Sequence, residues 1–331
     1  MKKLLFCSFA ILIYLTSLPG CAHVRVRHAV PESLVGKAVV VGMPDIRCYV
    51  DKDESPFMRQ SLADSFKDEG KSDYLVDGVK NYPVLIIGGG VSNSAYGIGL
   101  MKGWREEGSR PVFKIVTGYS SGSLLAVATF LGKDCEKRLA DLFTSISTGD
   151  VVQAKNIFSV IFGDSVNSSK LFSKKIDDIV NERLLADIAI EHKKGRRLYV
   201  GTTDLDAQEF VIWDMGALAS KGGRESVVMF RKIMLASCSF PVMLPPVFFQ
   251  VEAGGKRYDE MHADGGVCGG IFYIHELMQD ARLAAGTIGT DPGAFKTRLY
   301  VLNCCYMSPH SKQIEDNLVA ITSRLIETNG A

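Results

Sequence analysis

The chain has 331 residues, of which 47% are hydrophobic, and its formal net charge at pH 7 is +1. This length fits one large α/β domain or two small ones, and the apolar content supports a sizeable core. The balanced charge argues against a nucleic-acid partner and against strong electrostatic steering.

The first twenty residues have the pattern of a secretory signal rather than of a folded segment. A basic start and an apolar run cover residues 2–18, and Leu18-Pro19-Gly20-Cys21 is similar to a bacterial lipobox with Cys21 as the lipid-modified residue. The apolar run is too short for an ordinary transmembrane helix. An ordinary cleaved signal is the alternative. By resemblance to Gram-negative lipoproteins, Ala22 after the cysteine favours attachment to the outer membrane of the cell envelope.

Six cysteines remain beyond Cys7 and Cys21, and none forms a C-x-x-C motif, so we expect no zinc site. An exported protein can form disulfides. Cys238, Cys268 and Cys304 nevertheless lie in apolar segments, and we expect them to be buried free thiols. The pairing of the cysteines stays open at this point.

Apolar runs and helical spacing alternate along the chain from about residue 82. We expect strands over 38–41, 84–87, 113–117, 198–203 and 299–302, and helices over 55–66, 95–107, 124–131, 227–236 and 314–325. Strands that alternate with helices predict an α/β fold with a mostly parallel central sheet, covered on both faces. Within it, residues 21–80 are expected to form an N-terminal extension that packs on a main domain of residues 81–331.

Gly118-Tyr119-Ser120-Ser121-Gly122 lies between a predicted strand and a predicted helix. A G-x-S-x-G motif in that context predicts a nucleophile elbow, a sharp turn that projects the Ser120 hydroxyl outward. Gly118 and Gly122 are expected because strand and helix cross too closely for a Cβ. The helix that begins at the turn directs its free N–H groups toward a developing oxyanion.

A glycine loop, Gly88-Gly89-Gly90, follows the strand predicted over 84–87 and precedes a helix. Such a loop can direct several backbone N–H groups at one point, as a phosphate cradle or as an oxyanion hole. Asn93 stands where the dinucleotide motif G-x-G-x-x-G needs its third glycine, and no G-K-[ST] motif follows. We therefore favour an oxyanion hole.

A serine nucleophile also needs a base, and the stretch from Met261 to Gly266 offers His262 and Asp264. Gly265 and Gly266 would place the Asp264 carboxylate on a tight, exposed backbone at the end of a strand. A plain β-turn is the other interpretation of Asp-Gly-Gly.

The order of these motifs resembles the patatin-like phospholipase family, specifically its bacterial lipoprotein branch. The resemblance rests on Ile87-Gly88-Gly89-Gly90, on Thr117–Gly122 and on Asp264-Gly265-Gly266, and it covers about residues 80–310. The segments Ala236–Pro241 and Tyr258–His262 are also similar to that branch. The resemblance implies a three-layer α/β/α fold and hydrolysis of phospholipid, lysophospholipid or other fatty-acyl esters.

Carried over to this sequence, the resemblance makes Ser120 the nucleophile and Asp264 the base of a Ser-Asp dyad. It implies no histidine in the mechanism, no metal and no cofactor. An aspartate at its usual pKa of about 3.9 is a weak base for a hydroxyl, so burial would have to raise that pKa. The implied partners are an acyl-ester substrate and a membrane, to which the protein is attached through lipid on Cys21. The oligomeric state is left open.

The oxyanion hole implied by the resemblance is formed by Gly88, Gly89, Gly90 and Val91, and here the sequence departs from the family. When Ala95-Tyr96 is aligned with the family, Val91 and Ser94 replace two glycines of the usual loop, and Asn93 takes the place of a basic residue. The chain also ends soon after its last predicted helix, which is expected to leave apolar surface for a membrane or a partner.

Two alternatives to a Ser-Asp esterase follow from these features. The altered glycine loop allows a catalytically weak envelope lipoprotein that binds lipid or a protein partner on the same scaffold. A Ser-His-Asp esterase could instead use His262, although α/β-hydrolases place the acid before the histidine and well apart from it. The sequence does not distinguish hydrolysis from acyl transfer, because both share an acyl-enzyme.

Overall fold

The computed structural model describes residues 26–50, 57–67, 70, 73–90, 94–144, 165–241, 244–268, 295–304, 311–317, 320, 321 and 324. The predicted signal segment with Cys21 and the loop residue Val91 lie outside these ranges. Among the described helices, none combines the length and the apolar character that a membrane crossing requires.

The described strands form one mixed sheet, in the order β1-β8-β9-β6-β5-β4-β10 with β2, β3 and β7 added beside this path. Its centre is parallel, because β10, β4, β5 and β6 run in one direction, whereas β7 and β9 both pair antiparallel with β6. The strand bounds are β1 Val39–Val40, β2 Arg47–Tyr49, β3 Leu75–Val76, β4 Val79–Ile87, β5 Ile115–Tyr119, β6 Arg197–Asp204, β7 Glu209–Asp214, β8 Val247–Ala253, β9 Lys256–Asp264 and β10 Phe295–Leu302.

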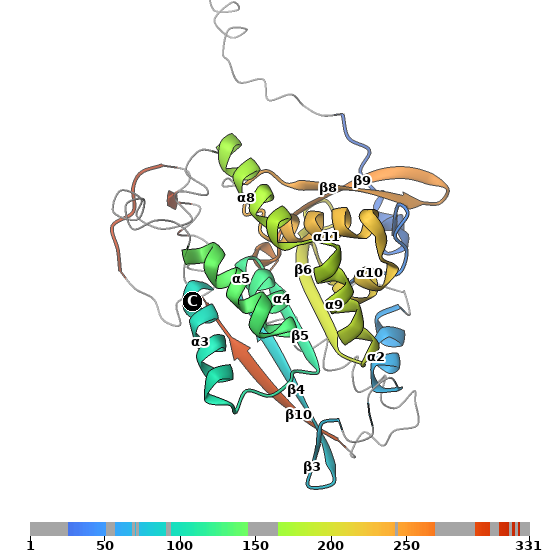
Figure 1. Cartoon of the computed structure of the whole chain (residues 1–331). Coiled ribbons are helices and arrows are strands. Elements are labelled where there is room, and N and C mark those ends of the chain that lie inside the picture. The colour runs from blue at the N-terminus through green and yellow to red at the C-terminus, as the bar shows by residue number, and fades with distance from the viewer. Residues whose placement is uncertain are drawn as a thin grey trace, which may run out of the picture.

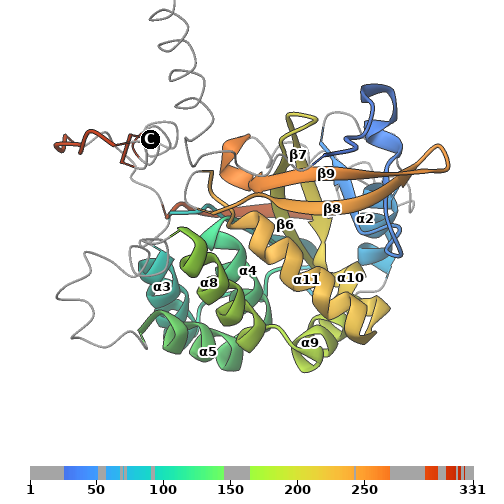
Figure 2. The ribbon, with the colours of Figure 1, turned by 90° about the horizontal axis from the view of Figure 1, so that it is seen from above.

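Helices cover the two faces of this sheet unequally in the described part of the chain. Helices α3, α4, α5 and α8 to α11 lie on one face, and α2 lies on the other (Figures 1 and 2). The helix bounds are α2 Phe57–Lys67, α3 Ser94–Glu107, α4 Ser121–Leu131, α5 Lys133–Thr144, α8 Ser165–Ile179, α9 Glu182–Lys193, α10 Met215–Lys221 and α11 Gly223–Ser237, with short 3-10 turns η1 Glu32–Lys37 and η3 Gly265–Val267.

The apolar run of β4 shows why its sequence does not alternate. Leu85 and Ile87 pack into the large core beneath α3 and α4, while Val84 and Ile86 pack on the opposite face against the core that includes α2. A strand buried on both faces needs apolar residues at every position. The predicted α/β class with a parallel centre is therefore confirmed.

The N-terminal residues join the sheet at two places. β1 pairs with β8, and β2 pairs with β7, so residues 39–49 extend the antiparallel part of the sheet. Of the helix expected over 314–325, residues 314–317 are not helical, residues 320, 321 and 324 are helical, and the others lie outside the described ranges.

Cys238 and Cys304 are buried, as expected, whereas Cys268 is exposed and the prediction for it was wrong. Cys268 follows η3 directly, where the chain leaves the sheet, so the apolar residues beside it do not place it in the core.

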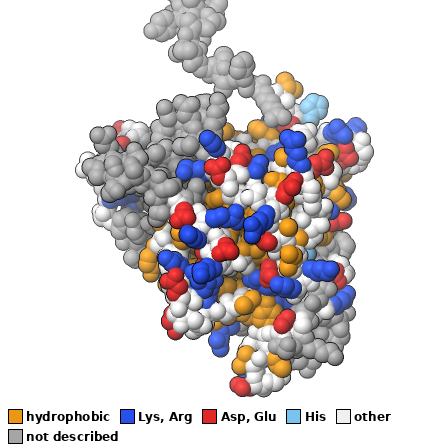
Figure 3. Space-filling model, viewed as in Figure 1, with side chains coloured by type: hydrophobic (Ala, Val, Ile, Leu, Met, Phe, Trp, Pro, Cys, Tyr) orange, Lys and Arg blue, Asp and Glu red, His pale blue; other side chains and the backbone are white. Residues whose placement is uncertain are grey.

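Lysine and arginine side chains alternate with acidic ones over the helices that face the viewer in Figure 3. Ion pairs between residues close in the chain include those of Lys194 and Arg196 with Glu191. The charges on the face in Figure 3 are interspersed rather than gathered into separate acidic and basic patches.

Candidate active site

Ser120 stands at a sharp turn between β5 and α4. Its backbone has φ 54° and ψ −142°, and it is the N-cap residue of α4. A positive φ is uncommon for a residue with a side chain and costs free energy unless the surroundings hold it. The turn therefore has the strained geometry of the nucleophile elbow that the sequence predicts.

The two outer glycines of the motif allow the close crossing. A Cβ on Gly118 would lie 2.4 Å from the carbonyl oxygen of Gly122, and one on Gly122 would lie 2.7 Å from the carbonyl oxygen of Gly88. Both contacts are with backbone atoms, which cannot move away by a change of rotamer as a side chain can. This confirms the reason for which glycine is expected at both positions.

Asp264 is the last residue of β9, and its position is fixed by pairing with β6. Thr202 is its partner in the sheet, and the hydroxyl of Thr203 donates to its carbonyl oxygen at 2.9 Å. Its Oδ1 accepts from the N–H of Gly266 at 2.8 Å and caps η3. Only 2% of Asp264 is exposed, so the expected exposed turn is wrong and the carboxyl lies in the core.

This environment changes the acidity of Asp264. Burial raises its pKa to about 7, while hydrogen bonding from the Ser120 side chain and from the Gly266 amide acts in the opposite direction. Burial dominates because the charged carboxylate loses its hydration. The Asp264 pKa thus lies in the range that suits a base near neutral pH.

The Ser120 hydroxyl and the Asp264 carboxyl are neighbours, but no hydrogen bond of regular geometry joins them. The hydroxyl is close enough to lower the Asp264 pKa, yet Oδ2 of the carboxyl has no hydrogen bond of regular geometry within the described residues. Catalytic hydrogen bonds are often long before substrate binds. The unused Oδ2 is therefore the oxygen available to take a proton.

Gly265 brings the two residues together. A Cβ at this position would lie 2.8 Å from the Cβ of Tyr119, the residue before Ser120, and 2.9 Å from the carbonyl oxygen of Gly201. Only a residue without a side chain lets the end of β9 approach the elbow so closely. Gly266 contributes its amide to the carboxyl of Asp264, as described above.

The glycine loop lies against the elbow. A Cβ on Gly89 would fall 2.5 Å from the Cβ of Ser120 and 3.0 Å from its hydroxyl oxygen. The amide of Gly88 donates to Leu302 in β10 at 2.9 Å. The amide of Gly90 donates to the Ser121 hydroxyl at 3.2 Å, which also accepts from Ser94 at 2.7 Å. Two of the predicted oxyanion donors thus have partners here, and Val91 lies outside the described residues.

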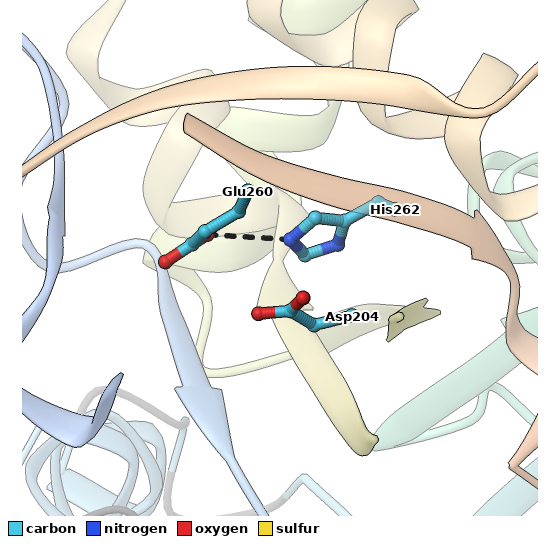
Figure 4. A group of neighbouring side chains, drawn as sticks. All are labelled: Asp204, Glu260 and His262. Carbon is cyan, nitrogen blue, oxygen red and sulfur yellow. Dashed lines mark hydrogen bonds and ion pairs between the residues drawn. The ribbon is translucent and has the colours of Figure 1, made fainter. Parts of the chain in front are cut away.

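His262 belongs to a different buried cluster, with Asp204 and Glu260 (Figure 4). Its Nε2 lies 3.3 Å from Glu260, and its Nδ1 lies 2.9 Å from the Thr202 hydroxyl, which also accepts from Trp213. Both ring nitrogens are occupied away from Ser120, which argues against a Ser-His-Asp arrangement.

The donor types in this cluster are those that bind metals, and their ligand atoms lie within 4.8 Å of one another. Arg47 of β2, however, donates through both terminal nitrogens to the Glu260 carboxylate, and Tyr49 donates to Asp204 at 2.8 Å. The guanidinium supplies the positive charge that the buried carboxylates require. Burial acts to raise the pKa of Glu260, but the charge of Arg47, together with the hydrogen bond from His262, outweighs burial and lowers this pKa to about 2. The cluster is therefore a structural ion-pair network.

Sequence reasoning missed two sets of residues around the site. Arg47 and Tyr49 gave no signal, because their partners are more than 150 residues away. Residues 237–239 contact both Ser120 and Asp264, and the only signal was the similarity of that segment to the family.

The elbow, the buried aspartate and the parallel sheet centre together define an α/β protein with a serine at a sharp turn between a strand and a helix. The sequence profile described as patatin-like phospholipase matches residues 85–273, more than half of the chain. The chain belongs to the patatin-like phospholipase family.

Other comparisons are more distant. A search of curated proteins found no match. Among solved structures, VipD from Legionella pneumophila is similar with 17% sequence identity and a TM-score of 0.33, over 58% of this chain and 47% of VipD. The chain therefore spans less than half the length of that neighbour.

Proposed function

We propose that this protein hydrolyses fatty-acyl esters of lipids through an acyl-enzyme on Ser120, with Asp264 as the base. The observation that carries the proposal is the buried carboxyl of Asp264, whose pKa is lowered by hydrogen bonding from the Ser120 side chain and whose Oδ2 has no regular hydrogen bond in the described part of the chain. A pKa of about 7 lets this carboxylate accept a proton near neutral pH. Membership in a phospholipase family supports a lipid ester as substrate.

In the first half of the reaction, Ser120 Oγ attacks the ester carbonyl carbon while its proton passes to Asp264 Oδ2. The tetrahedral intermediate then expels the alcohol, which takes the proton from Asp264, and the acyl group stays on Ser120. In the second half, Asp264 takes a proton from water, whose oxygen attacks the acyl-enzyme carbonyl. The second tetrahedral intermediate expels Ser120 Oγ, which takes this proton back from Asp264, and the fatty acid is released. The carboxylate and the serine hydroxyl are both regenerated.

The developing oxyanion needs N–H donors, and Gly89 lies against Ser120, because a Cβ at Gly89 would fall 3.0 Å from Ser120 Oγ. The amide of Gly88 already donates to the carbonyl oxygen of Leu302 in β10. The residues proposed to form the oxyanion hole are therefore Gly89, Gly90 and Val91. Gly90 could serve only after its amide leaves the Ser121 hydroxyl. The departures from the family loop therefore predict a lower rate than that of a loop with free amides.

The pairing of the Gly88 and Gly90 amides also favours one alternative, a weakly active lipoprotein that binds lipid or a protein partner.

We further propose that the chain is exported and anchored in the envelope, at the outer membrane, by lipid on Cys21. Metabolic labelling with a clickable fatty acid tests the anchor, because Cys21→Ala should abolish incorporation. Incorporation that survives this substitution would refute it.

Fluorophosphonate labelling of the soluble form from Ala22 tests the catalytic proposal. The unaltered protein should label, Ser120→Ala should not, and Asp264→Asn should label far more slowly. His262→Gln, checked for folding by circular dichroism, should still label, since the proposed chemistry does not use the imidazole. A folded, unaltered protein that does not label would support the binding role instead.

A further inference from the structure

The last turn of α11 contacts the backbone of Ser120 on its amide side. The Ser237 hydroxyl accepts from the N–H of Ser120 at 3.0 Å and donates to the carbonyl oxygen of Gly201 at 2.8 Å. Ser237 is fully buried. One oxygen therefore links the elbow to β6, the strand against which the end of β9 is paired.

The next two residues continue the same contact. The Cys238 thiol donates to the carbonyl oxygen of Ser120 at 3.2 Å, and the Ser123 hydroxyl donates to that oxygen at 2.6 Å. The carbonyl oxygen of Ser239 accepts from the N–H of Asp264 at 2.9 Å. Three consecutive residues, 237–239, thus hold both members of the proposed catalytic pair.

These hydrogen bonds can hold the Ser120 backbone in its strained conformation. A backbone at φ 54° returns to a relaxed conformation unless its neighbours hold it. Both polar groups of the Ser120 backbone have partners on or beside the 237–239 turn, and these partners are at least nine-tenths buried. Solvent therefore does not compete for the bonds that keep the turn strained.

We propose that the 237–239 turn sets the geometry between Ser120 and Asp264, and that Ser237 is a positioning residue for the reaction. The proposal rests on the proposed function for its effect on rate. Ser237 touches no reacting atom; it acts through the backbone of the nucleophile. A misplacement of a reacting group by about 1 Å can cost on the order of 100-fold in rate.

The test is Ser237→Ala in the soluble form from Ala22. Fluorophosphonate labelling and hydrolysis of p-nitrophenyl butyrate should fall about 10- to 100-fold, in kcat rather than in KM, because the substrate pocket is unchanged. The apparent pKa of the pH profile should not fall, because Asp264 stays buried and weaker hydrogen bonding from a displaced Ser120 side chain acts to raise its pKa. Ser237→Cys keeps a weak donor and acceptor at the same atom, so its rate should lie between serine and alanine.

Two matched controls separate positioning from loss of stability. Ser226→Ala removes a buried hydroxyl from the same helix, and that hydroxyl has no partner within the described residues. Ser65→Ala removes a buried hydroxyl that donates to the Leu62 carbonyl in α2, far from the elbow in the chain. Both variants should keep the rate of the unaltered protein within about twofold, with melting temperatures measured in parallel.

A second readout does not depend on activity. Amide hydrogen exchange of a peptide that spans Ser120 should speed up in Ser237→Ala but in neither control, because the Ser120 N–H loses its acceptor. If the unaltered protein proves inert, the proposed function fails while exchange still decides whether Ser237 holds the elbow. Unchanged exchange would overturn the positioning role. If the unaltered protein is active, an unchanged kcat in Ser237→Ala would also overturn the positioning role. A lowered apparent pKa in that variant would overturn it too, because it would indicate a general loss of order in the site.

Discussion

Replacement of Asp264 by asparagine should stabilise the protein at alkaline pH while it stops the proposed reaction. Asparagine has nearly the same shape, and its side-chain oxygen can keep the bond from the Gly266 amide, which is 2.8 Å from the carboxyl. What the change removes is a buried negative charge. A catalytic group kept in an unfavourable environment lowers stability, and its removal restores it.

The magnitude follows from the raised pKa of Asp264. Its value of about 7 in the folded protein, against 3.8 as the ordinary value, is a difference of about 3.2. At about 1.4 kcal/mol for each pH unit, this corresponds to about 4 kcal/mol. Between these two pH values the folded state binds a proton that the unfolded state has released, so stability falls as pH rises from about 4 to 7.

The assay is urea unfolding of both proteins at a series of pH values from 4 to 8. The stability of Asp264→Asn minus that of the unaltered protein should rise by about 4 kcal/mol across this range. The buried asparagine N–H adds a cost of about 1–3 kcal/mol, but this cost does not depend on pH. Asp64→Asn, at an exposed position of α2, is the control. A flat difference for Asp264→Asn would refute the argument that burial raises the Asp264 pKa.

Three further outcomes are expected. The kcat/KM of ester hydrolysis should rise with pH to a plateau, with a midpoint near the Asp264 pKa of about 7, in a profile from pH 5 to 9; a midpoint near 4 would contradict this. Gly89→Ala should reduce fluorophosphonate labelling at least 100-fold, since its Cβ would fall 2.5 Å from that of the nucleophile, while Gly99→Ala, with open space around its Cβ, should label normally. Arg47→Met should destabilise by about 3–5 kcal/mol in urea unfolding, because the buried Glu260 charge loses its partner. The double change with Glu260→Gln should recover part of that loss, and a double variant as unstable as the single one would oppose the explanation.

The sequence was sufficient for the local part of the site. The elbow depends on a strand, a turn and a helix that are contiguous in the chain, and its glycines are required by contacts among residues 87–126. The same holds for the parallel centre, because buried strands such as β4 and β5 have continuous apolar runs.

The sequence was not sufficient where a residue depends on a distant partner. Asp264 looked like a turn residue, and only its pairing with β6 places it in the core. Arg47 and Arg197 are charged side chains that sequence patterns assign to the surface, yet one is buried against Glu260 and the other against the backbone of Ser61. Strands β8 and β9 were not predicted because charged residues interrupt their apolar runs. Glu252 in β8 is exposed, whereas Asp259 and Glu260 in β9 are buried against arginines far away in the chain.

The contact of residues 237–239 with the elbow also bears on the order in which the protein is made. The serine turn is synthesised more than 100 residues before the segment that holds it, and the aspartate follows later still. A nascent chain that has reached residue 200 contains the Ser120 turn and its local bond from Ser123, but lacks the bonds from Ser237 and Cys238 that also hold the strained backbone. The reactive arrangement therefore arises only after nearly the whole described chain has left the ribosome.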